Sequence, residues 1–307
     1  RKGVVLAVDR GELACGGTLS LAFAGDDHRD ADEGKPFFWF VGYMDPHDPY
    51  FAHPYDGTGF GRAAHQHPDP DEAPRLRELY DGEITYWDEH FGNLVQELKD
   101  AGLYEDTTII ITSDHGEEFQ DHGGYWHGTT LYDEQVRVPL FVKLPGNQRG
   151  GTTVRHWVQS IDLMPSLLKQ LDIEIPDGVQ GGDVFEGTDV VYGEESHEGN
   201  VLESVRERRG TDEWKLIVAN EGNPRGLEPT ELYRVDFDPG ERENRAEDQS
   251  EVEMLRETLD RERARASEGA AETVTRELTR EEIEANCNLG YWSREACCEQ
   301  GFSNFCD

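Results

Sequence analysis

Hydrophobic residues fall into short uninterrupted runs that predict buried strands. Residues 36–43 read PFFWFVGY, and the prolines of the following MDPHDPY segment end the run. Thr107–Thr112 reads TTIIIT and is rich in β-branched residues, which favour strands. Val138–Leu144 is a third apolar run, closed by Pro145 and Gly146. Runs of this length without polar alternation are typical of strands covered on both faces.

Between the first two runs the pattern changes to one that predicts a long helix. From about Pro74, large apolar residues recur at steps of three and four, which places them on one helix face, and Gly102 ends the helix. These residues are Leu76, Tyr80, Ile84, Trp87, Phe91, Leu94 and Leu98. A second helix is predicted over Ile161–Leu171, with Pro165 in its first turn.

This order of strands and helices predicts an α/β fold with a mostly parallel sheet flanked by helices. A helix between two strands favours a parallel pair, so both strands end at one edge of the sheet. Ligands of open α/β sheets bind beyond the carboxyl ends of the strands. The MDPHDPY segment and the tripeptide Asp114-His115-Gly116 both follow predicted strands. We therefore expect the functional site there.

Composition along the chain predicts four parts. Residues 1–35 form an atypical N-terminal segment in which Val4–Val8 fits a short strand. Residues 36–190 form the α/β core, and residues 191–250 form a small C-terminal sheet subdomain. Residues 251–307 form a charged helix and a cysteine-containing tail, so that the last two parts make an α+β appendage. Strand-like pieces in the appendage region are Val190–Gly193, Trp214–Ala219 and Glu231–Val235, and a charged helical stretch follows at 247–284.

Charge limits the classes of partner. The chain has 65 acidic and 29 basic residues, a formal net charge of -36. So acidic a protein repels nucleic acid and anionic membranes, and neither is expected to bind. We interpret the charge as the adaptation of a halophile-like protein, because concentrated salt screens self-repulsion. The alternative, a surface for a cationic partner, lacks a localised acidic patch.

The cysteines and the absence of long apolar runs indicate in which cellular compartment the protein is expected. No apolar run approaches the roughly 20 residues that span a bilayer, and no signal-peptide pattern is visible, which predicts a cytoplasmic protein. An odd number of cysteines without a C-x-x-C pair argues against a zinc knuckle or a disulfide framework. Four cysteines lie in the last part of the chain, where a metal or disulfide cluster is the alternative to an unstructured tail.

Residues 112–140 gather the side chains best suited to chemistry, namely Asp114, His115, His122 and His127. A carboxylate beside an imidazole at a strand end can hold a divalent cation. Carboxylates suit calcium, magnesium or manganese, and imidazole shifts the preference towards manganese or zinc. Asp-His-Gly alone would equally fit a capping aspartate and a surface histidine.

Longer blocks around this tripeptide resemble the sulfatases of the alkaline phosphatase superfamily. The blocks are PFFWFVGYMDPHDPY (36–50), the segment from YDGEITYWDEHF to KLPG (80–146) and VQSIDLMPSLLKQLDIEIPDGVQGGDV (158–184). EWKLIVAN and ELYRVDFDPGERENRA resemble the family's small C-terminal sheet. The resemblance covers residues 36–246 in the family's order. It implies an alkaline-phosphatase-like fold and a metal-dependent hydrolase of small sulfate esters, with calcium, or alternatively magnesium or manganese, as its ion.

The resemblance also implies roles for individual residues. Asp114 and His115 match the metal ligands after the family's central strand. His47 matches a histidine that contacts the sulfate group, and His127 lies near a basic residue that binds sulfate or assists the leaving group. His122 either orients the metal loop or is an ordinary hydrogen-bonded loop residue. Three histidines of the long loop are expected to be solvated, namely His53, His65 and His67.

The family's nucleophile block is not recognisable. That block is C/S-x-P/A-x-R, whereas Cys15 stands in ACGGTLS. VVLAVDRGE (4–12) echoes the family's first strand, which would make Asp9 a metal ligand, and coincidence is the alternative. On either interpretation much of the family's N-terminal half is missing, so we expect a fragment with weak or no activity.

Two other classes of function remain open. A phosphodiesterase, phosphonate hydrolase or phosphoglycerol transferase of the same superfamily would act on phosphate esters and differ mainly at the nucleophile. A non-catalytic remnant would bind only a partner or nothing, and metal content after purification would distinguish it. The sequence does not indicate an oligomeric state.

Overall fold

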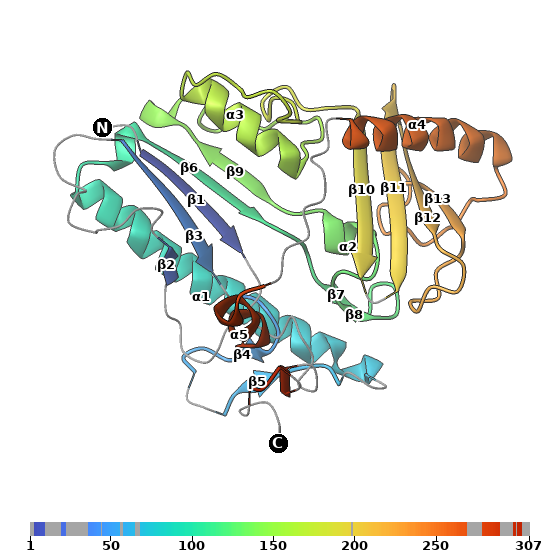
Figure 1. The fold of residues 1–307 in the computed structure, drawn as a ribbon, viewed down its shortest axis with the longest axis horizontal. Helices are drawn as coiled ribbons and strands as arrows, with labels where there is room; N and C mark the ends of the chain where they lie inside the picture. The colour runs from blue at the N-terminus through green and yellow to red at the C-terminus, as the bar shows by residue number, and fades with distance from the viewer. Residues whose placement is uncertain are drawn as a thin grey trace. The chain divides into compact units, whose positions relative to one another are not determined.

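The computed structural model describes residues 3–9, 20–22, 36–43, 45–55, 58–64, 68–197, 199–268, 278–288, 297–298 and 300–302. The chain separates into two units, which are described one at a time (Figure 1). The first unit comprises residues 1–114, 139–150 and 272–307, and the second comprises residues 115–138 and 151–271.

A five-stranded sheet forms the centre of the first unit, in the order β2-β3-β1-β6-β9. The central strand β1 (Gly3–Asp9) runs parallel to both β3 (Phe37–Tyr43) and β6 (Thr107–Ser113). The outer strands β2 (Ser20–Ala22) and β9 (Leu140–Lys143) are antiparallel to their neighbours. The predicted parallel sheet is thus confirmed at its centre. The strand expected at Val4–Val8 is confirmed as β1, and it occupies the centre of the sheet.

The predicted long helix is α1 (Ala73–Asp100), preceded by the short η1 (Pro70–Glu72). Its apolar face packs Leu94 and Leu98 with Val41 of β3 and Ile109 of β6. Gly102 follows the helix with φ of 68°, a backbone conformation that glycine adopts without strain. Three short elements complete this part, namely β4 (Tyr50–Phe51), β5 (Phe60–Gly61) and η2 (Tyr104–Asp106). The long loop expected at 52–74 therefore contains a two-stranded pairing, β4 with β5.

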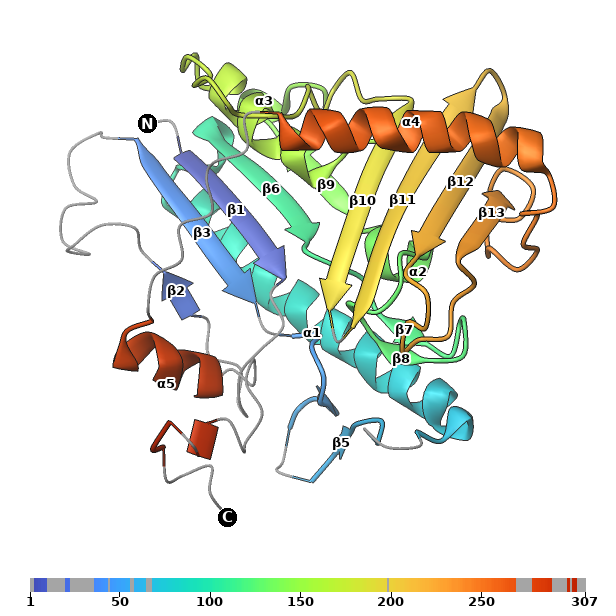
Figure 2. The ribbon, with the colours of Figure 1, turned by 45° about the vertical axis from the view of Figure 1, so that its right-hand side comes forward.

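The second unit is built on an antiparallel sheet of four strands. These are β10 (Val190–His197), β11 (Asn200–Arg209), β12 (Asp212–Ala219) and β13 (Thr230–Arg234). Helix α4 (Gln249–Ser267) crosses them (Figure 2) and buries Leu255 and Leu259 against Val205 and Leu216. The predicted charged helix is therefore a packed helix of the C-terminal sheet, because its apolar stripe covers the strands.

Further short elements of the second unit precede this sheet in the chain. They are β7 (Glu118–Phe119), β8 (Tyr125–Trp126), α2 (Asp133–Val136), η4 (Ser160–Asp162) and α3 (Leu163–Gln170). Leu131 and Tyr132 pack with Leu202 and Ile217 of the sheet. Residues between 115 and 190 therefore group with the C-terminal sheet, except for 139–150, and the predicted boundary at 190 does not coincide with the division into units.

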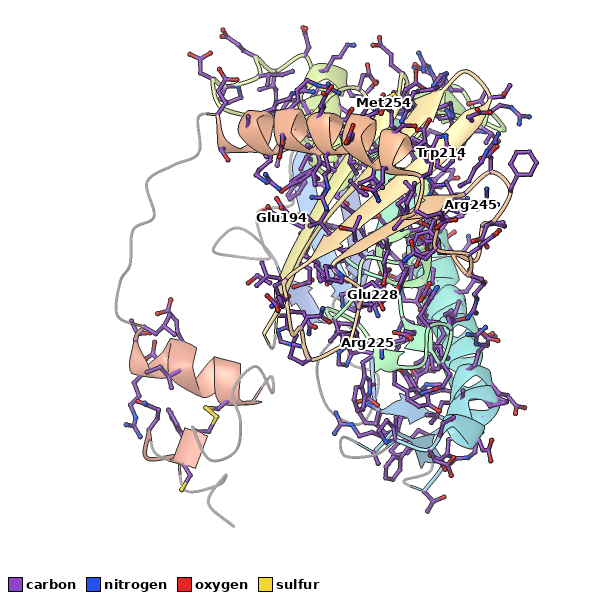
Figure 3. The ribbon with its side chains drawn as sticks, turned by 90° about the vertical axis from the view of Figure 1, so that its right-hand side faces the viewer. Glu194, Trp214, Arg225, Glu228, Arg245 and Met254 are labelled. Carbon is purple, nitrogen blue, oxygen red and sulfur yellow. A yellow bond between two sulfur atoms is a disulfide. The ribbon has the colours of Figure 1, made fainter. Side chains whose placement is uncertain are left out.

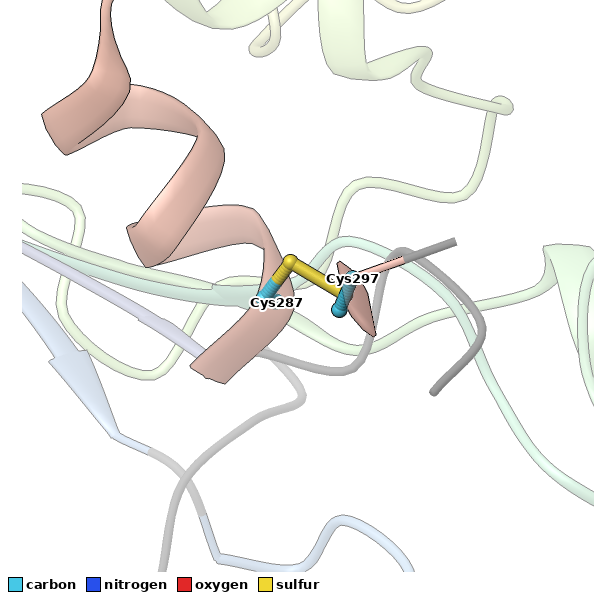
Figure 4. The surroundings of a disulfide bond; sticks show 2 residues. All are labelled: Cys287 and Cys297. Atoms are coloured by element: carbon cyan, nitrogen blue, oxygen red, sulfur yellow. A yellow bond between two sulfur atoms is a disulfide. The ribbon is translucent and has the colours of Figure 1, made fainter. Parts of the chain in front are cut away.

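The C-terminal tail corrects the expectation from its cysteines. The structure has a disulfide between Cys287, in α5 (Arg280–Asn288), and Cys297, with Cα atoms 5.7 Å apart (Figure 4). Phe302 and Ile283 pack against this pair, which excludes a wholly unstructured tail. Among the described residues, no helix has the length and apolar character of a membrane span.

Candidate functional site

The candidate site begins where the parallel strands of the first unit end together. The register pairs Asp9, the last residue of β1, with Tyr43 at the end of β3 and Ser113 at the end of β6. Asp114 follows Ser113 and is exposed. Two aspartates thus stand at the ends of adjacent strands, at the carboxyl edge where α/β sheets bind ligands. Aspartate supplies the oxygen ligands that a hard divalent cation prefers.

His47 lies beyond the end of β3 in the same unit and is half-buried. Its Nδ1 is 2.6 Å from the carbonyl oxygen of Asp48, and since a carbonyl can only accept, Nδ1 carries the proton. The buried Asp48 accepts from Arg62 Nε at 2.5 Å. These contacts fix the backbone of the proline-containing segment and, with it, the position of the His47 ring.

The loop after Asp114 belongs to the second unit and brings two predicted residues together. His115 and His127 stack with ring centroids 3.6 Å apart and planes at 18°. His115 Nδ1 lies 2.9 Å from the carbonyl oxygen of Gly116. His127 Nδ1 lies 3.2 Å from Glu117, whose side chain is 4% exposed. A backbone carbonyl that holds the proton on Nδ1 is the usual partner of a histidine that binds metal through Nε2.

A buried carboxylate fixes the fold of this loop. Glu118 accepts hydrogen bonds from Arg225 Nη2 at 2.6 Å and from Gln135 Nε2 at 2.9 Å. It also accepts from the backbone N–H groups of Gly124 and His122, at 2.8 and 3.0 Å. Arg225 lies at the end of the sheet away from α4 (Figure 3). The charged pair and the two backbone bonds together define the β7–β8 turn.

His122 lies inside this loop, where both of its ring nitrogens face acceptors. Nδ1 is 2.5 Å from Glu134 Oε1, Nε2 is 3.0 Å from the carbonyl oxygen of Glu241, and the ring stacks on Tyr132 at 3.7 Å. Burial opposes protonation, but the hydrogen bond and charge of Glu134 outweigh it and raise the pKa of His122. These contacts favour the interpretation of His122 as a structural residue.

The raised pKa of His122 predicts a pH dependence of stability. The imidazolium stabilises the native state fully below the unfolded pKa of about 6.5, and the contribution is lost as pH rises through the higher native pKa. We expect wild type to lose stability relative to His122→Gln between pH 6 and pH 8.5, measured by urea unfolding. An unfolding free-energy difference between the two proteins that stays constant over this range would contradict the prediction.

Several residues differ from expectation or escaped it. His53 was predicted to be solvated, but its side chain is 14% exposed and stacks on Tyr86 of α1, with centroids 3.8 Å apart. His65, His67 and Cys15 lie outside the described residues. Glu117, Glu118 and Arg225 were not predicted from the sequence. The acidic pair follows the Asp-His-Gly tripeptide directly and was a usable signal, whereas Arg225 has none.

Comparisons with known proteins agree with these observations. A family model described as Sulfatase matches residues 21–173, and one described as N-sulphoglucosamine sulphohydrolase, C-terminal, matches residues 121–268. The ulvan-active sulfatase of Formosa agariphila is 31% identical, over 52% of this chain and 33% of that protein. The multifunctional alkaline phosphatase superfamily protein PehA of Trinickia caryophylli is 31% identical, over 48% of this chain and 37% of that protein.

Solved structures show the same fold. The phosphonate monoester hydrolase of Silicibacter pomeroyi has a TM-score of 0.60 at 22% identity, over 83% of this chain and 60% of that one. The alignments cover 37% and 33% of the lengths of the two curated relatives named above, so the chain spans about a third of each.

Proposed function

Because this chain belongs to the sulfatase family of the alkaline phosphatase superfamily, we propose that it forms the metal-binding part of a hydrolase of small sulfate esters. The observation that carries the proposal is the strand register, which sets Asp9 of β1 beside Ser113 and therefore beside the start of the Asp114-His115 pair. The register favours the interpretation of residues 4–12 as the family's first strand, over coincidence.

Asp114, His115 and Asp9 are the proposed ligands of a divalent cation, with calcium preferred over magnesium or manganese. Asp114 and His115 are consecutive in the chain, and two carboxylates favour a hard cation. When bound, such an ion polarises the oxygens of a sulfate group and neutralises developing charge. The carbonyl of Gly116 supports the ligand role of His115 by fixing its tautomer.

His47 and His127 are proposed to act on the sulfate group and the departing oxygen. The proton on His47 Nδ1 is held by a carbonyl, which orients the ring. Glu117 beside Nδ1 orients the ring of His127, which is proposed to donate a proton to the leaving group. No cysteine or serine of this chain stands in a C/S-x-P/A-x-R setting, so the covalent step is not assigned and we propose slow turnover or none.

The proposal is tested with an aryl sulfate and the matching aryl phosphate, each with and without calcium. We expect calcium-dependent hydrolysis that is slow, faster on the sulfate, and lost in Asp114→Ala. If hydrolysis is undetectable, sulfate is expected to raise the melting temperature only when calcium is present, as bound product would. Faster cleavage of the phosphate would favour the phosphohydrolase alternative. If the protein shows neither turnover nor calcium-dependent binding of sulfate, the result would favour a non-catalytic remnant.

A further inference from the structure

A second group of cation-binding side chains lies in the first unit, apart from the ligands proposed above. Asp45 follows β3, His53 follows β4, and Glu83 belongs to α1. One ligand atom from each of the three lies within 4.8 Å of the others. Glu83 is fully buried, and the other two are partly buried. Three segments of the chain thus bring an imidazole and two carboxylates to a common point.

The contact between His53 and Glu83 has the spacing of two ligands on one ion. His53 Nε2 is 3.1 Å from Glu83 Oε2, close enough for an ion pair. The directions do not fit a hydrogen bond, however, and the buried Nε2 has no hydrogen-bond partner. Neighbouring ligand atoms that each lie about 2.1 Å from one cation are about 3.0 to 3.4 Å apart.

Both side chains are held in this orientation by other contacts. The ring of His53 lies flat on Tyr86, with an angle of 5° between the planes. The other carboxylate oxygen of Glu83 accepts the backbone N–H of Phe51. A cation beside Oε2 would stabilise the ionised form of this fully buried carboxylate. The site is therefore largely preformed.

We propose that Asp45, His53 and Glu83 bind a second divalent cation, one that fastens the 45–53 segment to α1. One nitrogen and two oxygen ligands favour zinc or manganese over calcium. His47 lies within this segment, so the ion would position the backbone that carries it. The site stands on the geometry of the first unit alone and does not depend on the proposed hydrolase activity.

The test is a titration of the full chain with zinc and with manganese, followed by calorimetry. Asp114→Asn serves as the background, because it removes a ligand of the proposed catalytic ion. We expect saturable binding to persist in that background and to weaken by more than about tenfold when Asp45→Asn or His53→Gln is added. The control is His90→Gln, an exposed residue that also contacts Tyr86, which should leave the affinity unchanged.

Circular dichroism without metal checks that each variant is folded. Absence of saturable zinc or manganese binding in Asp114→Asn would overturn the proposal and leave His53 and Glu83 as an ion pair only. Binding that Asp45→Asn and His53→Gln both leave unchanged would overturn it as well. If the calcium-dependent sulfatase test fails but zinc still binds, the proposed function is rejected and this second site is retained.

Discussion

Replacing Glu118 with alanine is expected to lower the free energy of unfolding by about 3 to 5 kcal/mol. The carboxylate is fully buried and is paired with Arg225, whose side chain is 18% exposed. Its removal leaves Gln135 Nε2 and the N–H groups of Gly124 and His122 without this acceptor, and the Arg225 guanidinium keeps its bond to the carbonyl oxygen of His122 but loses the carboxylate. An unpaired buried charge costs far more than the pair itself contributes, so this change should be among the most damaging in the second unit.

Urea unfolding of Glu118→Ala and Arg225→Ala measures the loss, and the double variant tests the coupling. Because each single change strands the other partner, the double variant should lose clearly less stability than the sum of the two. Glu257→Ala removes an exposed glutamate of α4 and should change stability by less than about 0.5 kcal/mol. Equal losses for Glu118→Ala and Glu257→Ala would contradict the role of Glu118.

Changing Gly116 to alanine is expected to destabilise the second unit by about 3 kcal/mol and to weaken cation binding. A Cβ atom at this position would lie 2.1 Å from the carbonyl oxygen of Glu134, which is backbone and cannot rotate away. The N–H of Gly116 also donates to the carbonyl of Gln135 at 2.7 Å. Relief of the clash must therefore separate the His115–Gly116 segment from α2.

Thermal unfolding of Gly116→Ala measures the loss of stability, and a calcium titration measures the loss of cation affinity. Gly92→Ala is the matched control, since nothing lies within 4 Å of a Cβ there and the residue is inside α1. Alanine is the better helix former, so this control should gain about 0.5 to 1 kcal/mol. A Gly116→Ala protein with wild-type stability and wild-type calcium affinity would show that the close approach is unimportant.

The features predicted from the sequence are those set by local patterns. The apolar runs became β3 and β6, and the spacing of Leu94 and Leu98 gave the buried face of α1. Each of these segments carries a local pattern, which is an uninterrupted apolar run in the two strands and a step of three and four residues in the helix. The order of strands and helices also predicted that Asp114 lies at the carboxyl edge of the sheet.

The features that escaped prediction depend on long-range contacts. Strand β11 reads NVLESVRERR, whose buried positions carry both apolar and polar side chains, so no apolar run marks it. Glu118 and Arg225 are 107 positions apart, and no local pattern joins them. Glu83 did leave a signal, because it lies three residues after Tyr80 and seven after Leu76, on the buried face of α1. A charged residue in that stripe indicates a buried polar contact.

We propose above that the ends of β1 and β6 hold a cation through Asp9 and Asp114, with His115. Calcium titration of the melting temperature tests it in wild type, Asp9→Asn and Asp114→Asn, with Asp88→Asn on the exposed side of α1 as the control. An ion that binds only the native state adds about 2.7 kcal/mol to the free energy of unfolding when its free concentration is about 100 times its Kd. We expect a calcium-dependent rise in melting temperature in wild type and in Asp88→Asn, and no such rise in the other two variants. An equal rise in all four proteins, or none in wild type, would contradict it.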